Sequence, residues 1–292
     1  MSMALTDAPA AVVGHRGTRT RTALIALVAV ELLILFAPVL QWLYGRWTLS
    51  VWHHAHGLLI PPVVAWFCYE ELRRFKGQPV DGSAWGFAFV LPALALHVVD
   101  TTMHTQLLGA VALVLALPGL SLLLLGVPRT RAIVFPLAFA AFALPIPLSM
   151  TEPLHLALRQ ITTAGITTLL PLLNVPFYSE QTTIYLSTGT VQIADACSGF
   201  STLYASLAVA CLLAYSATSR MRATVTLLAA APLAIGANIL RVLLLVALVA
   251  WRGGGILETW VHPASGMLTF AIALPALFWI AQRRDQNEGA TR

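Results

Sequence analysis

The chain has 292 residues, of which 58% are hydrophobic and only 10% are charged. Soluble domains carry about 25% charged residues, so this composition excludes a water-soluble globule. It also excludes a disordered or fibrous chain, because the apolar residues recur in long runs that must be buried in lipid or protein. The sequence therefore predicts a membrane protein that crosses the bilayer several times.

Eight apolar runs are long enough to cross a bilayer, which takes about 20 helical residues. They are residues 22–44, 57–72, 84–100, 106–126, 132–150, 199–217, 223–250 and 264–281. A ninth run, 153–173, carries His155 and Arg159 near its start, and we expect it to form an interfacial or re-entrant helix. The predicted fold is all-α and polytopic, with about eight transmembrane helices.

Basic residues decide the orientation of these spans, because Lys and Arg accumulate in short loops on the cytoplasmic side. With the N-terminus inside and 153–173 on the outer side, thirteen of the seventeen Lys and Arg residues lie in inner loops. This bias accounts for the net charge of +5, so the charge indicates no nucleic-acid partner. We expect a multi-pass protein of the cell membrane (inner or plasma membrane).

The predicted organisation is a single membrane domain with two short cytoplasmic ends. Residues 1–21 form a basic N-terminus, 22–281 form the transmembrane domain, and 282–292 form a tail. Segment 174–196 differs from the apolar runs in its residue pattern. Apolar and polar residues alternate there with period two around Ser-Thr-Gly at 187–189. That alternation predicts a short extracytoplasmic β-hairpin.

The hairpin leads into Cys197, at the outer mouth of the sixth span. Three cysteines are too few for a disulfide framework. Cys68 and Cys211 lie roughly 16–21 Å deeper in the membrane, at the rise of a helical residue, so neither is expected to pair with Cys197. A small packing residue is the usual role of such a cysteine, and a reactive thiol is the alternative.

Arg241 lies in the outer half of span 223–250, where an arginine needs a polar cavity or a partner. Asn238 shares its helix face at i−3, which favours an inward polar stripe over an arginine that snorkels to the headgroups. His262 stands at the outer start of the last span, where an interfacial role beside Trp260 is common. Yet Cys197, Arg241 and His262 reach one level of the membrane from three spans, as a composite site requires.

These three residue types suit acyl transfer. A thiol attacks a carbonyl as a thiolate, and a histidine can take its proton and later return it to a leaving amine. An arginine in a site of low dielectric constant can lower the thiol pKa and stabilise an oxyanion. The hypothesis is cleavage or transfer of an acyl group at the membrane surface.

Four short motifs follow one another along the predicted outer side. They are WHHAHGLLIP at 52–61, ACSG at 196–199, NILR at 238–241, and His262 with Gly266. In this order they resemble the exosortase/archaeosortase family of polytopic cysteine transpeptidases. The first is similar to the family's Ser-His-Gly motif, with Ala55 where serine is common, and the resemblance extends from about residue 45 to 281.

The resemblance implies a membrane protease or transpeptidase whose catalytic domain is 22–281. Its partner would be the C-terminal sorting signal of secreted proteins, made of a short motif, a membrane span and a basic tail. Cleavage at the outer face would leave a Cys thioester for an amine or water, with no cofactor. The implied roles are Cys197 as nucleophile, Arg241 as transition-state stabiliser and His262 as acid/base. Supporting roles are expected for His56, Asn238, Asp195, Ser198 and Gly199.

Two other classes of protein could also have this arrangement of spans and polar residues. An intramembrane metallohydrolase would bind zinc through outer-face groups, which are His53, His54, His56, His262 and Glu258. No His-Glu-x-x-His helix occurs, and the first three histidines lie too close in sequence to be natural joint ligands, so no metal is expected. A non-catalytic transporter or export component would place polar groups at the membrane midplane, whereas here they gather at one surface.

Overall fold

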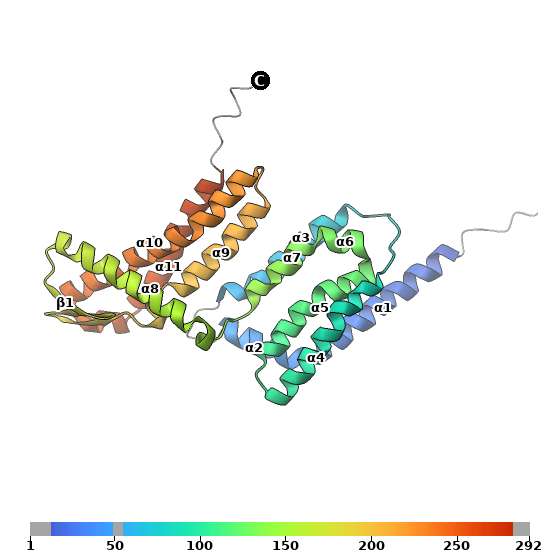
Figure 1. Cartoon of the computed structure of the whole chain (residues 1–292), viewed down its shortest axis with the longest axis horizontal. Coiled ribbons are helices and arrows are strands. Elements are labelled where there is room, and N and C mark those ends of the chain that lie inside the picture. Colours follow the sequence, from blue (N-terminus) through green and yellow to red (C-terminus); the bar gives the residue numbers. More distant parts are fainter. Residues whose placement is uncertain (1–12, 49–54, 283–292) are drawn as a thin grey trace, which may run out of the picture. The chain divides into compact units, whose positions relative to one another are not determined.

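The computed structural model describes residues 13–48 and 55–282 (Figure 1). Within these ranges the chain is mostly helical, with one small antiparallel sheet of three strands. The chain forms two compact units. The described residues 13–48 and 58–144 belong to the first, and 55–57 with 145–282 belong to the second. The predicted helical membrane fold with a small β element is confirmed.

The first unit is a group of helices around α4 and α5. In chain order it contains α1 (Val13–Leu35), α2 (Ala37–Thr48), α3 (Ile60–Arg73), η2 (Ala84–Gly86), α4 (Phe87–Met103), α5 (Leu107–Leu125), α6 (Val127–Ala132), α7 (Val134–Phe139) and η3 (Ala140–Ala143). Ala110 and Ala112 of α5 are fully buried against Phe36, Val39 and Leu43. The small alanine side chains let α5 approach the segment 36–43 closely, as is usual for helices in membranes.

One arginine of the predicted inner loops is buried in this unit. Arg129 donates hydrogen bonds to the carbonyl oxygens of Pro79 at 2.9 Å, Gln78 at 2.9 Å and Phe75 at 3.3 Å. Its guanidinium also lies 5.5 Å from the centre of the Phe75 ring. Through these three bonds Arg129 holds the loop between α3 and α4.

The second unit is arranged around one long helix, α10. After η1 (Ala55–Leu58), which spans the boundary, it contains α8 (Leu148–Leu169), η4 (Leu170–Leu173), β1 (Phe177–Glu180), β2 (Thr183–Leu186), β3 (Gly189–Gln192), η5 (Asp195–Cys197), α9 (Phe200–Tyr215), α10 (Arg220–Arg252), η6 (Gly254–Glu258) and α11 (Val261–Gln282). Helices α8, α9 and α11 all pack against α10. Ser219 caps its N-terminus by accepting a hydrogen bond from the Arg222 amide.

The predicted hairpin is confirmed at its turn. Leu186 pairs with Gly189 in the β2–β3 ladder, so Ser187 and Thr188 form a two-residue turn. The Thr188 hydroxyl donates to the Val249 carbonyl at 2.8 Å and fixes the turn on α10. The alternation did not predict β1, which pairs with the other edge of β2.

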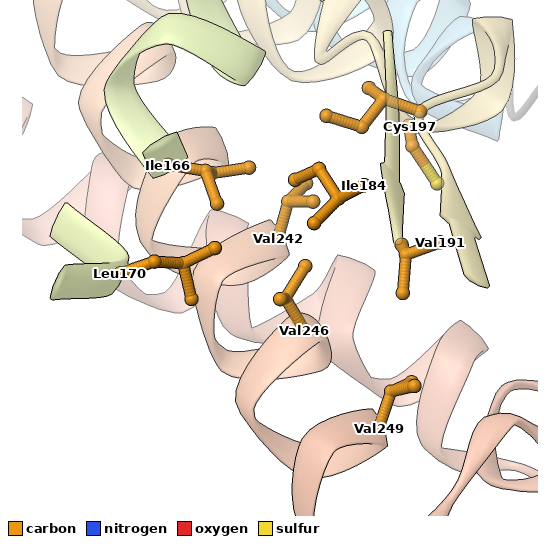
Figure 2. Packing of buried hydrophobic residues seen from close by; sticks show 9 residues of the cluster. Ile166, Leu170, Ile184, Val191, Cys197, Val242, Val246 and Val249 are labelled. Atoms are coloured by element: carbon orange, nitrogen blue, oxygen red, sulfur yellow. The ribbon is translucent and has the colours of Figure 1, made fainter. Parts of the chain in front are cut away.

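The sheet packs on α8 and α10 through a single apolar cluster (Figure 2). Its buried members are Ile166 and Leu170 of α8, Ile184, Val191 and Ile193 of the hairpin, Val242, Val246 and Val249 of α10, and Cys197. The three α10 valines recur at helical spacing and so form one face. This cluster fixes the end of the hairpin and therefore the point at which the chain enters Cys197.

The observed lengths of the helices differ from the membrane spans that the sequence predicts. In the described part of the chain five helices are long and apolar enough to cross a membrane, or six if α1 and α2, bent by 64°, count as one. Predicted spans 57–72, 132–150 and 199–217 contain shorter helices. By contrast, Leu148–Leu173 is 26 residues long and passes the same test. The count of about eight is therefore approximate.

Proline explains part of this difference. Proline lacks an amide hydrogen and is favoured in the first helical turn, where Pro61 and Pro62 open α3. After η3 the sequence Leu-Pro-Ile-Pro at 144–147 interrupts the helix again, and α8 starts at Leu148. Hydropathy measures how apolar a run is and does not detect such breaks.

Candidate active site

Cys197 ends η5, the short turn between β3 and α9. The residue is only 8% exposed, and its amide donates to the Ala194 carbonyl at 2.9 Å. Cys68, Cys197 and Cys211 form no disulfide with one another. Two residues later Gly199 adopts φ +87° and caps the start of α9. The turn thus redirects the chain from the sheet into α9 and holds the thiol between them.

Asn238 of α10 packs directly on this turn. A Cβ atom at Gly199 would lie 2.6 Å from the Asn238 Cγ atom, which is closer than real contacts allow. The Asn238 Nδ2 group donates to the Cys197 carbonyl at 3.1 Å and to the Thr162 hydroxyl of α8 at 3.2 Å. The amide therefore ties the cysteine to two helices, and glycine at 199 makes that approach possible.

Arg241 lies one helical turn beyond Asn238 and is 7% exposed, so its predicted inward orientation is confirmed. Its Nε group donates to the Ser265 hydroxyl of α11 at 2.9 Å. A Cβ atom at Gly266 would be 3.9 Å from the guanidinium, an ordinary van der Waals distance. Arg241 consequently bridges α10 and α11 beside the turn that carries Cys197.

Two opposing effects act on the Cys197 thiol. Burial raises its pKa above the ordinary value, because the thiolate loses hydration, and the positive charge of Arg241 lowers the pKa and offsets part of that rise. The net direction is upward. A thiol in this environment needs a base to become nucleophilic near neutral pH.

His262 is the second residue of α11, and its side chain lies outside the described residues. Along the helix its position precedes Ser265 and Gly266, the α11 residues beside Arg241, by about one turn. The acid/base role of His262 stays a prediction.

A row of aromatic rings begins at His56. Its ring meets Tyr204 edge-on at 5.1 Å, Tyr204 stacks with Phe200 at 6.0 Å, and Phe200 lies 4.6 Å from His155. The row follows the first turns of α9, directly after the Cys-Ser-Gly segment. His56 therefore belongs to the surroundings of the turn.

A protein-family model described as transmembrane exosortase matches residues 47–279, most of the chain. The chain belongs to the transmembrane exosortase family. No curated protein and no solved structure matches it. The match includes all four motifs and ends close to the limits that the motifs suggested. Family membership makes this exosortase a multi-pass membrane protein and implies a peptidase or transpeptidase that takes part in processing sorting signals.

Residues on both sides of Cys197 contact α8 in this exosortase. Arg159 pairs with the Asp195 carboxylate at 3.1 Å. The Ser198 hydroxyl donates to the Asp195 carbonyl at 2.8 Å and lies 3.0 Å from the His155 Nδ1 atom. His155 and Arg159 stand out in the sequence as polar residues near the start of the apolar run 153–173, whereas Thr162 does not. Their spacing of four and three residues on one helix face was the available signal.

A metal site in this exosortase would need several histidine or acidic side chains grouped together. Within residues 13–48 and 55–282 no three His, Cys, Asp or Glu side chains are grouped to hold a metal ion. His53 and His54, on which the metallohydrolase alternative rests, lie outside the described residues.

Gly199→Ala is expected to destabilise the exosortase, because alanine disfavours φ +87° and its Cβ would overlap Asn238. The two effects together cost about 2–4 kcal/mol, which should lower the thermal midpoint in detergent by several degrees. Gly236→Ala in α10 is the matched control, since its new Cβ would meet nothing within 4 Å beyond its chain neighbours and the nearby backbone of its own helix. Equal midpoints for the two variants would contradict the contact.

Arg241→Met is expected to raise the pKa of the Cys197 thiol further, because it removes the charge that lowers it. At a fixed pH near neutrality the thiolate fraction then falls, so iodoacetamide alkylation slows and its profile moves to higher pH. The rate is measured by mass spectrometry in a Cys68→Ala, Cys211→Ala background. Arg241→Lys keeps a positive charge and is the control. If the pH dependence of alkylation is the same in Arg241→Met as in the wild type, the electrostatic contact between Arg241 and Cys197 is ruled out.

Proposed function

We propose that this exosortase is a cysteine protease or transpeptidase that cleaves C-terminal sorting signals at the outer face of the membrane. The observation that carries the proposal is the placement of a buried thiol, Cys197, next to a buried guanidinium, Arg241. Burying the charged guanidinium is costly, and so is forming the thiolate in the same place, and acyl transfer through a thioester is a use for that pair which agrees with the family.

In the first half of the reaction the Cys197 thiolate attacks the carbonyl carbon of the scissile peptide bond. A carbon–sulfur bond forms and the carbonyl oxygen becomes an oxyanion. His262, having taken the thiol proton, returns it to the amine of the departing C-terminal fragment as the carbon–nitrogen bond breaks. The product is a thioester between Cys197 and the retained protein.

In the second half an amine or a water molecule attacks the thioester. His262 accepts the proton of the attacking group, the carbon–sulfur bond breaks, and the thiol is restored. The amine gives a transferred product and water gives a hydrolysed one.

Arg241 stabilises the oxyanion in both halves. Its Nε group donates to the Ser265 hydroxyl, and the two Nη groups are the donors that would bind the oxyanion. Fixed donors in a buried site act more strongly on developing charge than donors in water, because little solvent screens them. The same positive charge favours the thiolate before the attack.

The substrate is a short motif followed by a membrane span and a basic tail. Its tail would lie on the cytoplasmic side, where Lys and Arg of membrane proteins accumulate. That orientation carries the motif to the outer surface, the side to which the basic loops of this chain assign Cys197. The bilayer thus aligns substrate and nucleophile at one depth.

Cys197→Ala is expected to abolish processing, with a rate loss of at least about a thousandfold, because the nucleophile is removed. The C-terminus of a co-expressed substrate carrying a sorting signal is followed by mass spectrometry. Cys211→Ala, which removes a thiol within α9, is the control and should process normally. A mature C-terminus in the Cys197→Ala strain would exclude Cys197 as nucleophile.

Arg241→Lys is expected to lower kcat by roughly 10²–10³-fold, because a point charge does not reproduce the planar guanidinium fork. The measurement is turnover of a purified substrate in detergent or proteoliposomes. Arg252→Lys, at the exposed end of the same helix, is the control. Wild-type turnover with lysine at 241 would count against the oxyanion role.

A further inference from the structure

Helix α8 presents three polar side chains to the turn that contains Cys197. His155, Arg159 and Thr162 are four and three residues apart, so they share one helix face. The same face continues to Ile166 and Leu170, which are fully buried in the cluster beneath the sheet. The apolar end of the face anchors α8 in the core, and the polar end meets the cysteine turn.

The first contact holds the residue two positions before the cysteine. The Arg159 Nη1 group lies 3.1 Å from the Asp195 Oδ1 atom, and the two side chains are 22% and 27% exposed. An ion pair that is mostly withdrawn from solvent is screened less than a surface pair. Asp195 is therefore held to α8.

The second contact holds the residue after the cysteine. Ser198 is 1% exposed, and its hydroxyl donates its single hydrogen to the Asp195 carbonyl at 2.8 Å. The 3.0 Å contact with His155 must then run from the Nδ1 hydrogen to the serine oxygen. The Phe200 ring packs against the His155 ring, with their centres 4.6 Å apart and their planes tilted by 31°.

The third contact reaches the cysteine itself through α10. Thr162 accepts a hydrogen bond from the Asn238 amide, which also binds the Cys197 carbonyl. The turn has few backbone hydrogen bonds of its own, from Cys197 to Ala194 and from Ser198 to Asp195. Side-chain contacts to α8 and α10 therefore hold the turn in its place.

We propose that His155 and Arg159 are positioning residues for the reaction at Cys197. They hold the turn on both sides of the nucleophile, so α8 sets the place of the thiol relative to Arg241. Their described bonds go to Ser198 and Asp195 and not to the thiol, which is why they position the reaction and do not carry it out. The inference rests on the proposed role of Cys197 as nucleophile.

The test uses Arg159→Met and His155→Leu in the full-length protein. Each should lower kcat by about 10–100-fold with little change in KM, because a shift of the nucleophile by about 1 Å costs a rate of this order while the substrate still binds. Maleimide labelling of Cys197, in a Cys68→Ala, Cys211→Ala background, should become several-fold faster as the turn leaves α8. Gln160→Met, an exposed neighbour on α8, is the control for both measurements.

Conservative variants separate positioning from folding. Arg159→Lys keeps a cation for Asp195, and His155→Asn keeps a donor close to the Nδ1 position, so both should recover much of the lost kcat and return labelling toward the wild-type rate. Wild-type kcat in Arg159→Met and His155→Leu would overturn the proposal. It would also be overturned if folded protein is lost and neither conservative variant recovers activity.

Labelling needs no substrate, so this proposal can fail independently of the proposed function. Processing that survives in Cys197→Ala would reject the nucleophile. Labelling rates that Arg159→Met and His155→Leu leave unchanged would reject the role of α8, whatever the outcome for the nucleophile.

Discussion

The hydrogen bond from the Asn238 amide to the Cys197 carbonyl is the contact on which the rest of the site depends. Asn238 is 1% exposed and its amide also binds Thr162, so one buried group joins α10, α8 and the cysteine turn. Burying an amide costs free energy unless its hydrogen bonds are made, and the two bonds from Nδ2 offset this cost for the donor group, while the described residues offer no partner to the Oδ1 atom. The amide can approach so closely because residue 199 has no side chain.

This contact also determines the electrostatics at the thiol. With the turn held against α10, Arg241 comes to lie beside Cys197 and bridges to Ser265 of α11. Burial makes the thiolate costly and, by the same exclusion of water, makes the charge of Arg241 effective over a short distance. A nucleophile and its electrostatic partner are thus placed by packing, in a chain with very few charged residues to spare.

Several features could be predicted from the sequence because they are local. Period-two alternation placed the hairpin turn at Ser187 and Thr188, and one helical turn placed Asn238 and Arg241 on one inward face. The motifs placed the chain in its family. The number of spans was less predictable, since hydropathy does not locate breaks at prolines such as Pro145 and Pro147. The alternation also did not reveal β1, which is a strand through its pairing with β2.

By itself, the sequence determined that this is a membrane protein and on which side its basic loops are favoured. It also singled out one thiol and one guanidinium as candidates for chemistry. These properties follow from composition and from position along one helix, and the bilayer orders them by depth. Only the tertiary structure decided that α8 holds the cysteine turn. His155 and Ser198 are 43 residues apart, and Thr162 and Asn238 are 76 apart. Lateral packing of helices brings such residues together, and depth in the membrane does not specify it.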